Sequence, residues 1–333
     1  MTGISGKDCT KLTRRGALKT AILGGAAIVA PQVMVRPAQA KAPMLGSMVP
    51  QFYRFTLGDF EITTLNDGLR PGDGPHPTFG SDQSAETVQA LLRENSLPET
   101  RFVNGFAPTL VNTGNELVLF DTGLGAGARA NGMGNTRNVL AAAGYTPEQV
   151  DVVVITHMHP DHIGGLMEDG APAYPNARYV TGETEYNFWS APERMSGPTE
   201  RVAKMVDGMV KPMAEKMTFI KDGDSVVSGI SGMDAAGHTP GHMIYMLESA
   251  GRSLVLTADT ANHFVVSLQR PDWEVAFDAD KAGAAATRKK VFDMIATDTL
   301  PFIGYHMPWP AVGFVEKMDV GYRYIPNSYQ MQL

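Results

Sequence analysis

Cysteine is almost missing from this sequence: Cys9 is the single one among 333 residues. One thiol can build neither a disulfide framework nor a cysteine-ligated metal cluster, so both classes are excluded. A basic excess is also lacking, because 28 Lys and Arg stand against 35 Asp and Glu, for a formal net charge of -7. That balance argues against nucleic-acid binding, which needs a basic face. Only one apolar stretch approaches membrane length, which excludes a protein with several membrane spans.

The rest of the composition is that of a globular protein with a sizeable core, since 43% of the residues are hydrophobic and 19% are charged. No charge run, low-complexity tract or short repeat follows residue 41. We therefore expect residues 41–333 to form one domain. Histidine is scarce, with eight residues, but the positions of these eight carry most of the functional information.

The first 40 residues have the order of an export signal. Arg14 and Arg15 precede a weakly apolar run at 21–30, and Ala38-Gln39-Ala40 offers the small-x-small pattern of a cleavage site. The paired arginines resemble a twin-arginine signal, whose pathway exports folded proteins. A membrane anchor is disfavoured because the run is short and rich in glycine, so we expect no stable membrane insertion after cleavage. Cleavage after Ala40 would also remove Cys9, which suits an oxidising periplasm.

Apolar runs of strand length alternate with stretches of helical spacing along the rest of the chain. The runs predict strands at 52–57, 61–66, 116–121, 150–155, 177–181, 229–235 and 253–257. Helical spacing predicts helices at 84–94, 138–143, 183–188, 200–210 and 280–296. Gly58-Asp59 predicts a hairpin between the first two strands. Because hairpins and interleaved helices occur together, the pattern favours a mixed-sheet α/β sandwich over a parallel doubly wound sheet.

A dense group of metal-binding side chains follows the strand predicted at 150–155. His157, His159, Asp161 and His162 lie within six residues of one another. His157 and His159 alternate and can point the same way, while Asp161 and His162 begin the next turn and can face a second position. Imidazole and carboxylate groups suit Zn²⁺, Mn²⁺, Fe²⁺ and Co²⁺. A solvated histidine-rich loop is the alternative, but further residues of these types follow downstream.

Those further residues stand where later apolar runs end. His238 follows the strand predicted at 229–235, Asp259 follows the run at 253–258, and His306 closes the run at 302–305. One such residue alone is more often a cap or a core residue. Because four predicted strands each end at such histidine or aspartate residues, the sequence predicts a metal site at one edge of the fold.

These residues resemble the metallo-β-lactamase-fold hydrolase superfamily, over roughly residues 50–328. The resemblance implies an αββα sandwich of two mixed β-sheets flanked by helices. A narrower likeness to the methyl parathion hydrolase subgroup, which is related to the quorum-quenching lactonases, is carried by the segments 53–54, 57–63, 67–68, 144–145, 164–167 and 321–324.

The resemblance also implies a ligand set for two divalent metal ions, with Zn²⁺ expected and Mn²⁺, Co²⁺ or Fe²⁺ as alternatives. One ion would be held by His157, His159 and His238, the second by Asp161, His162 and His306, and Asp259 would bridge both. Two such ions lower the pKa of a shared water, and the resulting hydroxide would attack the substrate. Asp161 would then accept or shuttle a proton, so Asp161 and Asp259 are the predicted catalytic carboxylates.

Three more residues have weaker assignments. Asp121 falls where the superfamily usually keeps a carboxylate that orients a ligand imidazole, with a plain turn aspartate as the alternative. His242 is the second histidine of Gly-His-Thr-Pro-Gly-His, and we expect it to be a buried structural residue. His263 lies one helical turn past Asp259, where it could line the substrate pocket or be an ordinary loop residue.

Aromatic residues near the ligands predict a pocket for a small, neutral, hydrophobic substrate, with ordinary core packing as the alternative for each: Phe106, Phe188, Trp189 and Trp309. The segment 123–135 is rich in Gly and Asn and has no aromatic residue, whereas the organophosphate-hydrolysing relatives carry one there. We therefore expect hydrolysis of lactones or aryl esters first, with phosphotriesterase activity as a side reaction.

Several other functions stay open at this point. A methyl parathion-type organophosphate hydrolase is the first alternative, and a β-lactamase or a metal-binding protein without enzyme activity is more remote. The oligomeric state is also open, and a homodimer is compatible with the sequence.

The export signal makes a prediction that does not depend on the enzyme's substrate. Replacement of both arginines, Arg14→Lys and Arg15→Lys, removes the pair that defines the twin-arginine route. The full-length precursor is then expected in the cytoplasm, where immunoblots of cell fractions would detect it. Unchanged export of the double variant would rule out this route, and a matched Lys11→Arg variant controls for general effects of substitution in the segment.

Overall fold

The computed structural model describes residues 43–329, and residues 48–329 belong to one compact unit. The predicted signal peptide at 1–40, with Cys9, Arg14 and Arg15, lies outside the described residues and stays a prediction. Within the described part of the chain, no helix is both long enough and apolar enough to cross a membrane.

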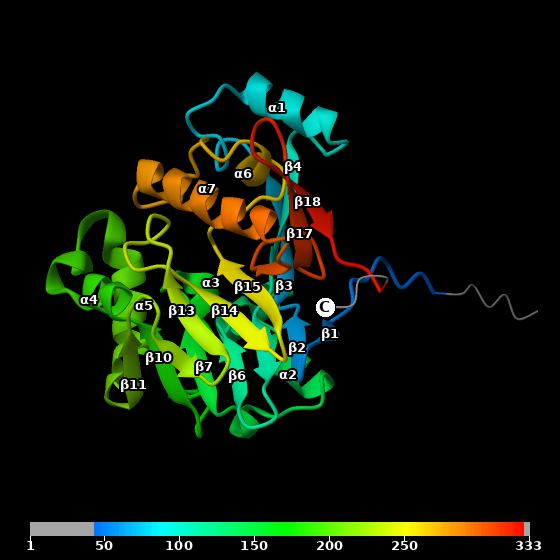
Figure 1. Cartoon of the computed structure of the whole chain (residues 1–333). Coiled ribbons are helices and arrows are strands. Elements are labelled where there is room, and N and C mark those ends of the chain that lie inside the picture. Colours follow the sequence, from blue (N-terminus) through cyan, green and yellow to red (C-terminus); the bar gives the residue numbers. More distant parts are fainter. Residues whose placement is uncertain (1–42, 330–333) are drawn as a thin grey trace, which may run out of the picture. The chain divides into compact units, whose positions relative to one another are not determined.

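Two seven-stranded mixed sheets form the centre of this unit (Figure 1). The first contains, in spatial order, β1 (Phe52–Leu57), β2 (Phe60–Leu65), β5 (Thr109–Asn112), β6 (Leu117–Phe120), β7 (Val152–Ile155), β10 (Arg178–Gly182) and β11 (Met217–Ile220). The second contains β12 (Ser225–Val227), β13 (Ile230–Asp234), β14 (Met243–Ser249), β15 (Arg252–Ala258), β16 (Phe302–Gly304), β17 (Val312–Lys317) and β18 (Tyr322–Pro326). Each sheet combines parallel and antiparallel pairs, as the sequence predicts.

The helices are α1 (Ala85–Glu94), α2 (Thr136–Ala142), α3 (Pro160–Ile163), α4 (Glu183–Ser190), α5 (Glu200–Met209), α6 (Val266–Gln269) and α7 (Lys281–Thr297). Helices α2, α4 and α5 pack on the outer face of the first sheet and α7 on that of the second. Helix α1 packs against α6, outside both sheets. Two short ribbons complete the fold: β3 (Gly68–Asp73) with β4 (Arg101–Phe106), and β8 (Met167–Glu168) with β9 (Ala171–Pro172).

Three apolar layers hold this sandwich together, and alternation along the strands decides which residue enters which layer. Val152 and Val154 point between the sheets, where Tyr245 and Leu256 of the second sheet meet them. Val153, between them in the sequence, points outward to helices α4 and α5. Burial on both faces explains why β7 is a continuous apolar run. Helix α7 packs its apolar face on the outer side of the second sheet. The layers are therefore helix, sheet, sheet, helix, and the predicted αββα architecture is confirmed.

Most predicted elements are present, although some of their ends differ. The hairpin at Gly58-Asp59 is confirmed, with Leu57 opposite Phe60. The strand predicted from residue 150 begins at Val152, because Val150 still ends a 3₁₀ turn over Pro147–Gln149. The helix predicted from 138 begins at Thr136, because the carboxylate of Asp67 accepts hydrogen bonds from both the main-chain N–H and the hydroxyl of that residue.

Candidate metal centre

Four segments that follow strands at one edge of the sandwich bring the predicted ligands together. The segment after β7 carries His157 to His162, and the loop between β13 and β14 carries His238. Asp259 follows β15 directly, and His306 follows β16. Because these strands end at the same edge, side chains 149 residues apart in the sequence share one site. All seven predicted ligands lie in it.

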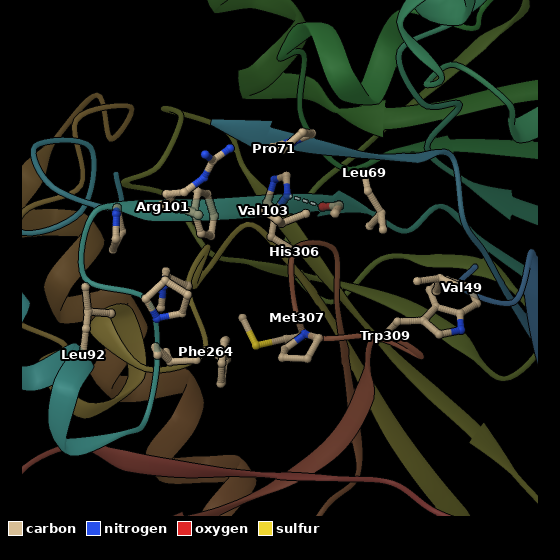
Figure 2. Close-up of a pocket in the computed structure, with 17 residues that line it drawn as sticks. Val49, Leu69, Pro71, Leu92, Arg101, Val103, Phe264, His306, Met307 and Trp309 are labelled. Atoms are coloured by element: carbon tan, nitrogen blue, oxygen red, sulfur yellow. Dashed lines mark hydrogen bonds between the residues drawn. The ribbon is translucent and has the colours of Figure 1, made fainter. Parts of the chain in front are cut away.

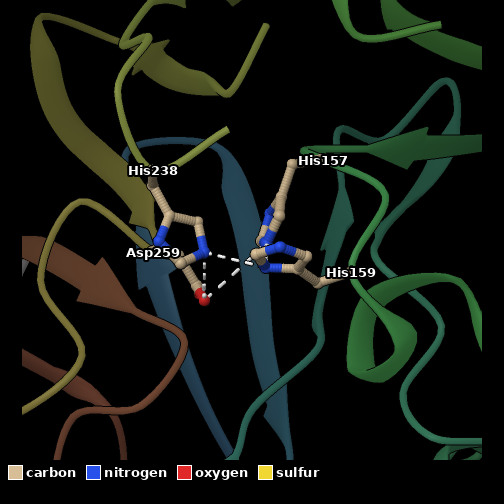
Figure 3. Close-up of side chains that lie close together, drawn as sticks. All are labelled: His157, His159, His238 and Asp259. Atoms are coloured by element: carbon tan, nitrogen blue, oxygen red, sulfur yellow. Dashed lines mark hydrogen bonds and ion pairs between the residues drawn. The ribbon is translucent and has the colours of Figure 1, made fainter. Parts of the chain in front are cut away.

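His157, His159, His238 and Asp259 form the first of two clusters (Figure 3). Nδ1 of His159 lies 3.1 Å from Nε2 of His157 and 3.0 Å from Nε2 of His238. Oδ2 of Asp259 is 3.3 Å from Nε2 of His238 and 3.7 Å from Nε2 of His157. Three imidazole nitrogens and one carboxylate oxygen thus converge on a single position.

Asp161, His162 and His306 form the second cluster. Oδ2 of Asp161 is 3.7 Å from Nε2 of His162 and 3.5 Å from Nε2 of His306. Asp259 reaches this cluster too, because its Oδ1 is 3.4 Å from Nε2 of His162 and its Oδ2 is 3.2 Å from Nε2 of His306. The side chain of Asp259 therefore lies between the two clusters.

The polar atoms left unpaired at this centre fit divalent cations. Nε2 of His162 and Oδ1 of Asp259 are buried and have no hydrogen-bond partner among the described residues. A buried polar atom without a partner costs about 1–3 kcal/mol, and a cation that accepts the lone pairs of both atoms removes that cost. The donor set of imidazole nitrogens and carboxylate oxygens suits Zn²⁺ as well as Mn²⁺, Fe²⁺ and Co²⁺. The residues present therefore fit two divalent ions and leave the identity of the metal open.

Hydrogen bonds on the far side of three imidazoles fix the orientation of their rings. Nδ1 of His162 lies 2.8 Å from Oδ2 of Asp121, and Nδ1 of His306 lies 2.8 Å from the main-chain oxygen of Gly105. Nδ1 of His238 lies 2.8 Å from Oδ1 of Asp278. With the proton of each ring at Nδ1, the lone pair of Nε2 faces the centre, as metal binding requires.

Burial and the neighbouring carboxylates act in opposite directions on these imidazoles. Burial lowers the pKa of His157 and of His159 well below the ordinary histidine value. Burial also opposes the charge on His238, but Asp259 and Asp278 outweigh it and raise the pKa of His238 to about 9. At His238 a cation and a proton therefore compete for the ring, so metal binding near neutral pH should release a proton from this residue.

Asp278 was not predicted, and it connects the centre to a buried arginine. Its Oδ2 accepts a hydrogen bond from Nη2 of Arg288 at 2.9 Å, while its Oδ1 faces His238. Arg288 lies on α7, is 1% exposed, and also donates to the main-chain oxygens of Thr260 and Pro271. The positive charge of Arg288 therefore offsets the negative charge of the buried Asp278 carboxylate.

Glu185 was also not predicted, although it joins two of the loops that carry ligands. Its Oε1 accepts hydrogen bonds from the N–H of Met158 and from the indole of Trp189, both at 2.8 Å. Its Oε2 accepts from the hydroxyl of Thr239 at 2.7 Å and from the N–H of Gly241 at 3.0 Å. The side chain is fully buried, and burial raises its pKa. The only local signal in the sequence is Trp189, one helical turn later.

His242 has both ring nitrogens engaged with the main chain. Nδ1 lies 3.1 Å from the oxygen of Ala235, and Nε2 accepts the N–H of Asp259 at 3.1 Å. Burial lowers the pKa of His242 to about 3, so the ring is neutral. This histidine therefore holds the main chain of Asp259, and neither of its nitrogens points at the clusters with a free lone pair.

The predicted pocket residues divide into two groups. His263 and Trp309 line a cavity that also includes the ligand His306. Phe106 packs edge-on to the ring of His306 but is absent from that cavity wall. Phe188 packs under the guanidinium of Arg194, and Trp189 bonds to Glu185, so both lie outside this wall. Pattern alone could not separate them, because helix α4 turns these two side chains toward the core.

The model of the metallo-beta-lactamase superfamily matches residues 108–300, which include six of the seven ligands. The chain belongs to the metallo-beta-lactamase superfamily. It is 25% identical to an N-acyl homoserine lactonase of Bacillus sp. over 155 residues, which cover 46% of this chain and 55% of the relative. A ribonuclease of Thermus thermophilus, TTHA0252, is 30% identical over 49% of this chain and 36% of the relative. The matches thus span about half or less of these curated relatives.

Solved structures of this fold match over most of the chain. AidC, a dizinc quorum-quenching lactonase in complex with the product N-hexanoyl-L-homoserine, has a TM-score of 0.76 and 26% identity, over 84% of this chain and 98% of AidC. The hydrolase AbOPH of the beta lactamase superfamily has a TM-score of 0.76 and 29% identity, over 85% of this chain and 99% of AbOPH. Together with the clusters, these matches identify a metal-dependent hydrolase.

The position of Asp259 between the clusters predicts the metal content. Seven ligands exceed the four that one ion uses, so we expect two metal equivalents per chain by elemental analysis after full loading. Asp259→Asn keeps the shape of the side chain but removes the charge that offsets both ions, and fewer than one equivalent should remain. Asp272→Asn, on the exposed surface, is the matched control. One equivalent or fewer in the wild type would contradict the two-ion site.

The buried position of Glu185 predicts a large effect of a small change. Glu185→Gln places an amide N–H₂ against groups that are themselves donors, so the free energy of unfolding should fall by about 2 kcal/mol. Glu183→Gln on the same helix removes only a surface pair with Lys221 and should cost less than about 1 kcal/mol. Denaturant unfolding of both variants measures the difference. Equal losses would show that the four bonds to Glu185 contribute little.

Proposed function

We propose that this hydrolase cleaves neutral lactones or esters that carry an apolar arm. The observation that carries the proposal is a cavity of about 570 Å³ whose wall includes the metal ligand His306 (Figure 2). A substrate with its apolar part in this cavity has its reacting group next to the clusters. Cavities of this size bury most of the surface of a small ligand.

The cavity wall is built outside the two sheets and is mostly apolar. The ribbon of β3 and β4 supplies Leu69, Phe102 and Val103, and the segment after His306 supplies Met307 and Trp309. The end of α1 and the residues before α6 close the remaining sides. Arg101 is the one wall residue with a permanent charge, and it is exposed. An uncharged arm of carbon atoms therefore fits the cavity better than a polar or ionic one.

The comparisons and the charge of the chain support the same substrate class. AidC and the Bacillus enzyme are named as lactonases, and AidC was solved with an acyl homoserine product. The formal net charge of -7 disfavours long-range attraction of anionic substrates. Neutral esters should therefore enter more readily than phosphate monoesters.

Two divalent ions held by these residues would activate a water as nucleophile and neutralise charge that develops on the carbonyl oxygen. Hydrolysis adds the water oxygen to the carbonyl carbon, breaks the bond to the alkoxide oxygen, and moves one proton to that oxygen. Asp161 is placed to carry this proton, since its side chain is 20% exposed whereas that of Asp259 is 4% exposed. Tyr305 donates its hydroxyl to the main-chain oxygen of Asp161 and so fixes the start of α3.

The position of segment 123–135 relative to the cavity bears on the choice of substrate. The Gly- and Asn-rich segment at 123–135 contributes no residue to the cavity wall, and its Met133 packs on Phe106 and Tyr305. Its lack of aromatic residues therefore says nothing about an aryl leaving group in this cavity. Aromatic wall residues come instead from Phe102, Phe264 and Trp309. Phosphotriesters, which need the same charge stabilisation, stay the second candidate class.

Export to the periplasm is part of the proposal, on the basis of Arg14, Arg15 and the run that follows them.

A substrate panel on one metal-loaded preparation tests this function. We expect kcat/KM to fall in the order lactone or aryl ester, phosphotriester, β-lactam, because the cavity favours a neutral apolar arm. Asp161→Asn should lower kcat for every class by at least about 100-fold if it carries the proton. A phosphotriester value tenfold above the others would overturn the ranking and make organophosphate hydrolysis the main activity.

A further inference from the structure

His263 is a buried polar side chain in the wall of the apolar cavity. It is 3% exposed, and three aromatic rings surround it. Its ring stacks on Phe102 with centroids 5.3 Å apart and planes at 27°, and on Phe264 with centroids 5.3 Å apart and planes at 3°. Phe79 packs against its edge at 5.3 Å. These contacts hold the imidazole in one orientation.

The main chain determines which nitrogen of this ring carries the proton. Nδ1 accepts the N–H groups of Val265 and Val266, both at 3.1 Å, where α6 begins. A nitrogen that accepts two N–H groups uses its lone pair, so it carries no proton of its own. Burial among aromatic rings lowers the pKa of His263 to about 3, so the ring is neutral. The one proton of the neutral imidazole is therefore on Nε2.

This Nε2–H group has no acceptor within residues 43–329. A bound molecule that offers an acceptor in the cavity can therefore receive this hydrogen bond. The other histidine of the wall, His306, has its Nδ1 engaged with Gly105 and its Nε2 facing Asp259. Arg101 is exposed and Trp309 is partly exposed, so water reaches both. Within the described part of the chain, His263 is thus the buried wall residue with a donor to spare.

We propose that Nε2–H of His263 donates a hydrogen bond to a carbonyl oxygen on the apolar arm of the substrate. This inference rests on the proposed function and narrows its substrate class to lactones or esters whose arm carries an acyl amide or ketone. An uncharged acceptor fits because the ring is neutral and the surrounding wall is apolar. His263 determines specificity and is no acid or base catalyst, because Nδ1 is occupied and Nε2 already holds its proton.

Two substitutions separate the donor from the structural role of the ring. His263→Asn places an amide oxygen near the position of Nδ1, so it keeps an acceptor for Val265 and Val266 but loses the donor. His263→Gln places an amide nitrogen near the position of Nε2, so it keeps a donor but loses the acceptor. Leu97→Ala, an apolar wall residue, is the control for a change of cavity shape alone.

The readout is the ratio of kcat/KM for two lactones with apolar arms of similar length. N-Hexanoyl-L-homoserine lactone carries an amide carbonyl on its arm, and γ-decanolactone carries only an alkyl chain. His263→Asn should lower this ratio about tenfold, the effect of one lost hydrogen bond to a buried acceptor. His263→Gln should keep the ratio within about threefold while its melting temperature falls, and Leu97→Ala should keep the ratio. A ratio that is unchanged in His263→Asn overturns the proposal.

A binding measurement distinguishes failure of this inference from failure of the proposed function. If the wild type cleaves neither lactone, the proposed function is wrong, and calorimetric titration then tests the cavity alone. The probes are N-hexanoyl-L-homoserine and decanoate, two carboxylates of which only the first has an amide carbonyl on its arm. His263→Asn should weaken binding of the first about tenfold relative to the second. An equal change for both probes contradicts the role of His263.

Discussion

Both metal-ligand clusters depend on the buried carboxylate of Asp259, which contacts residues of each. It faces imidazoles from three other segments of the chain, and its side chain is 4% exposed. A charge so deeply buried is tolerated only if opposite charge is held around it. His306 and His162 hold the pKa of Asp259 well below its ordinary value, even though burial acts in the other direction. The positions of β7, β15 and β16 are therefore constrained by one small group of atoms.

Close approach of the main chain makes this convergence possible. A Cβ atom on Gly165 would lie 2.2 Å from the oxygen of Thr122, where the ligand-bearing loop crosses the end of β6. A Cβ atom on Gly241 would lie 2.1 Å from the nitrogen of Glu185. Neither distance is sterically allowed, so only glycine lets these loops approach each other. The carboxylates of Glu185 and Asp67 then accept the N–H groups that the irregular loops leave unpaired.

The sequence predicts the parts of the site that are local or lie at strand ends. The run from His157 to His162 is compact, and apolar strands precede Asp259 and His306, so pattern is enough to place them. Asp278, Glu185 and Asp67 belong to ordinary polar stretches, and only the folded chain shows that they meet His238, Gly241 and Thr136.

The residues of the cavity wall also come from distant parts of the sequence, so the sequence pattern alone did not identify them. The ribbon of β3 and β4 contains Pro71 and Gly72, which weaken any strand pattern, so the sequence did not predict it. Phe102 therefore escaped notice, whereas Phe188 and Trp189 stood out because they lie close to each other on a helix. In the structure the ribbon residue reaches the cavity, and the helix residues face the core.

The two functional parts of the molecule rest on different kinds of structure. The metal ligands follow strands whose neighbours on both faces are packed, so their positions tolerate little change. The cavity wall comes from a two-stranded ribbon, the end of α1 and the segments after Asp259 and His306. These elements lie outside the two sheets, and substitutions there alter the shape of the cavity without moving a sheet strand. His263 stands where the two parts meet, four residues beyond Asp259 and at the start of α6. Selectivity for the arm of the substrate can therefore change at this position while the chemistry at the strand ends stays the same.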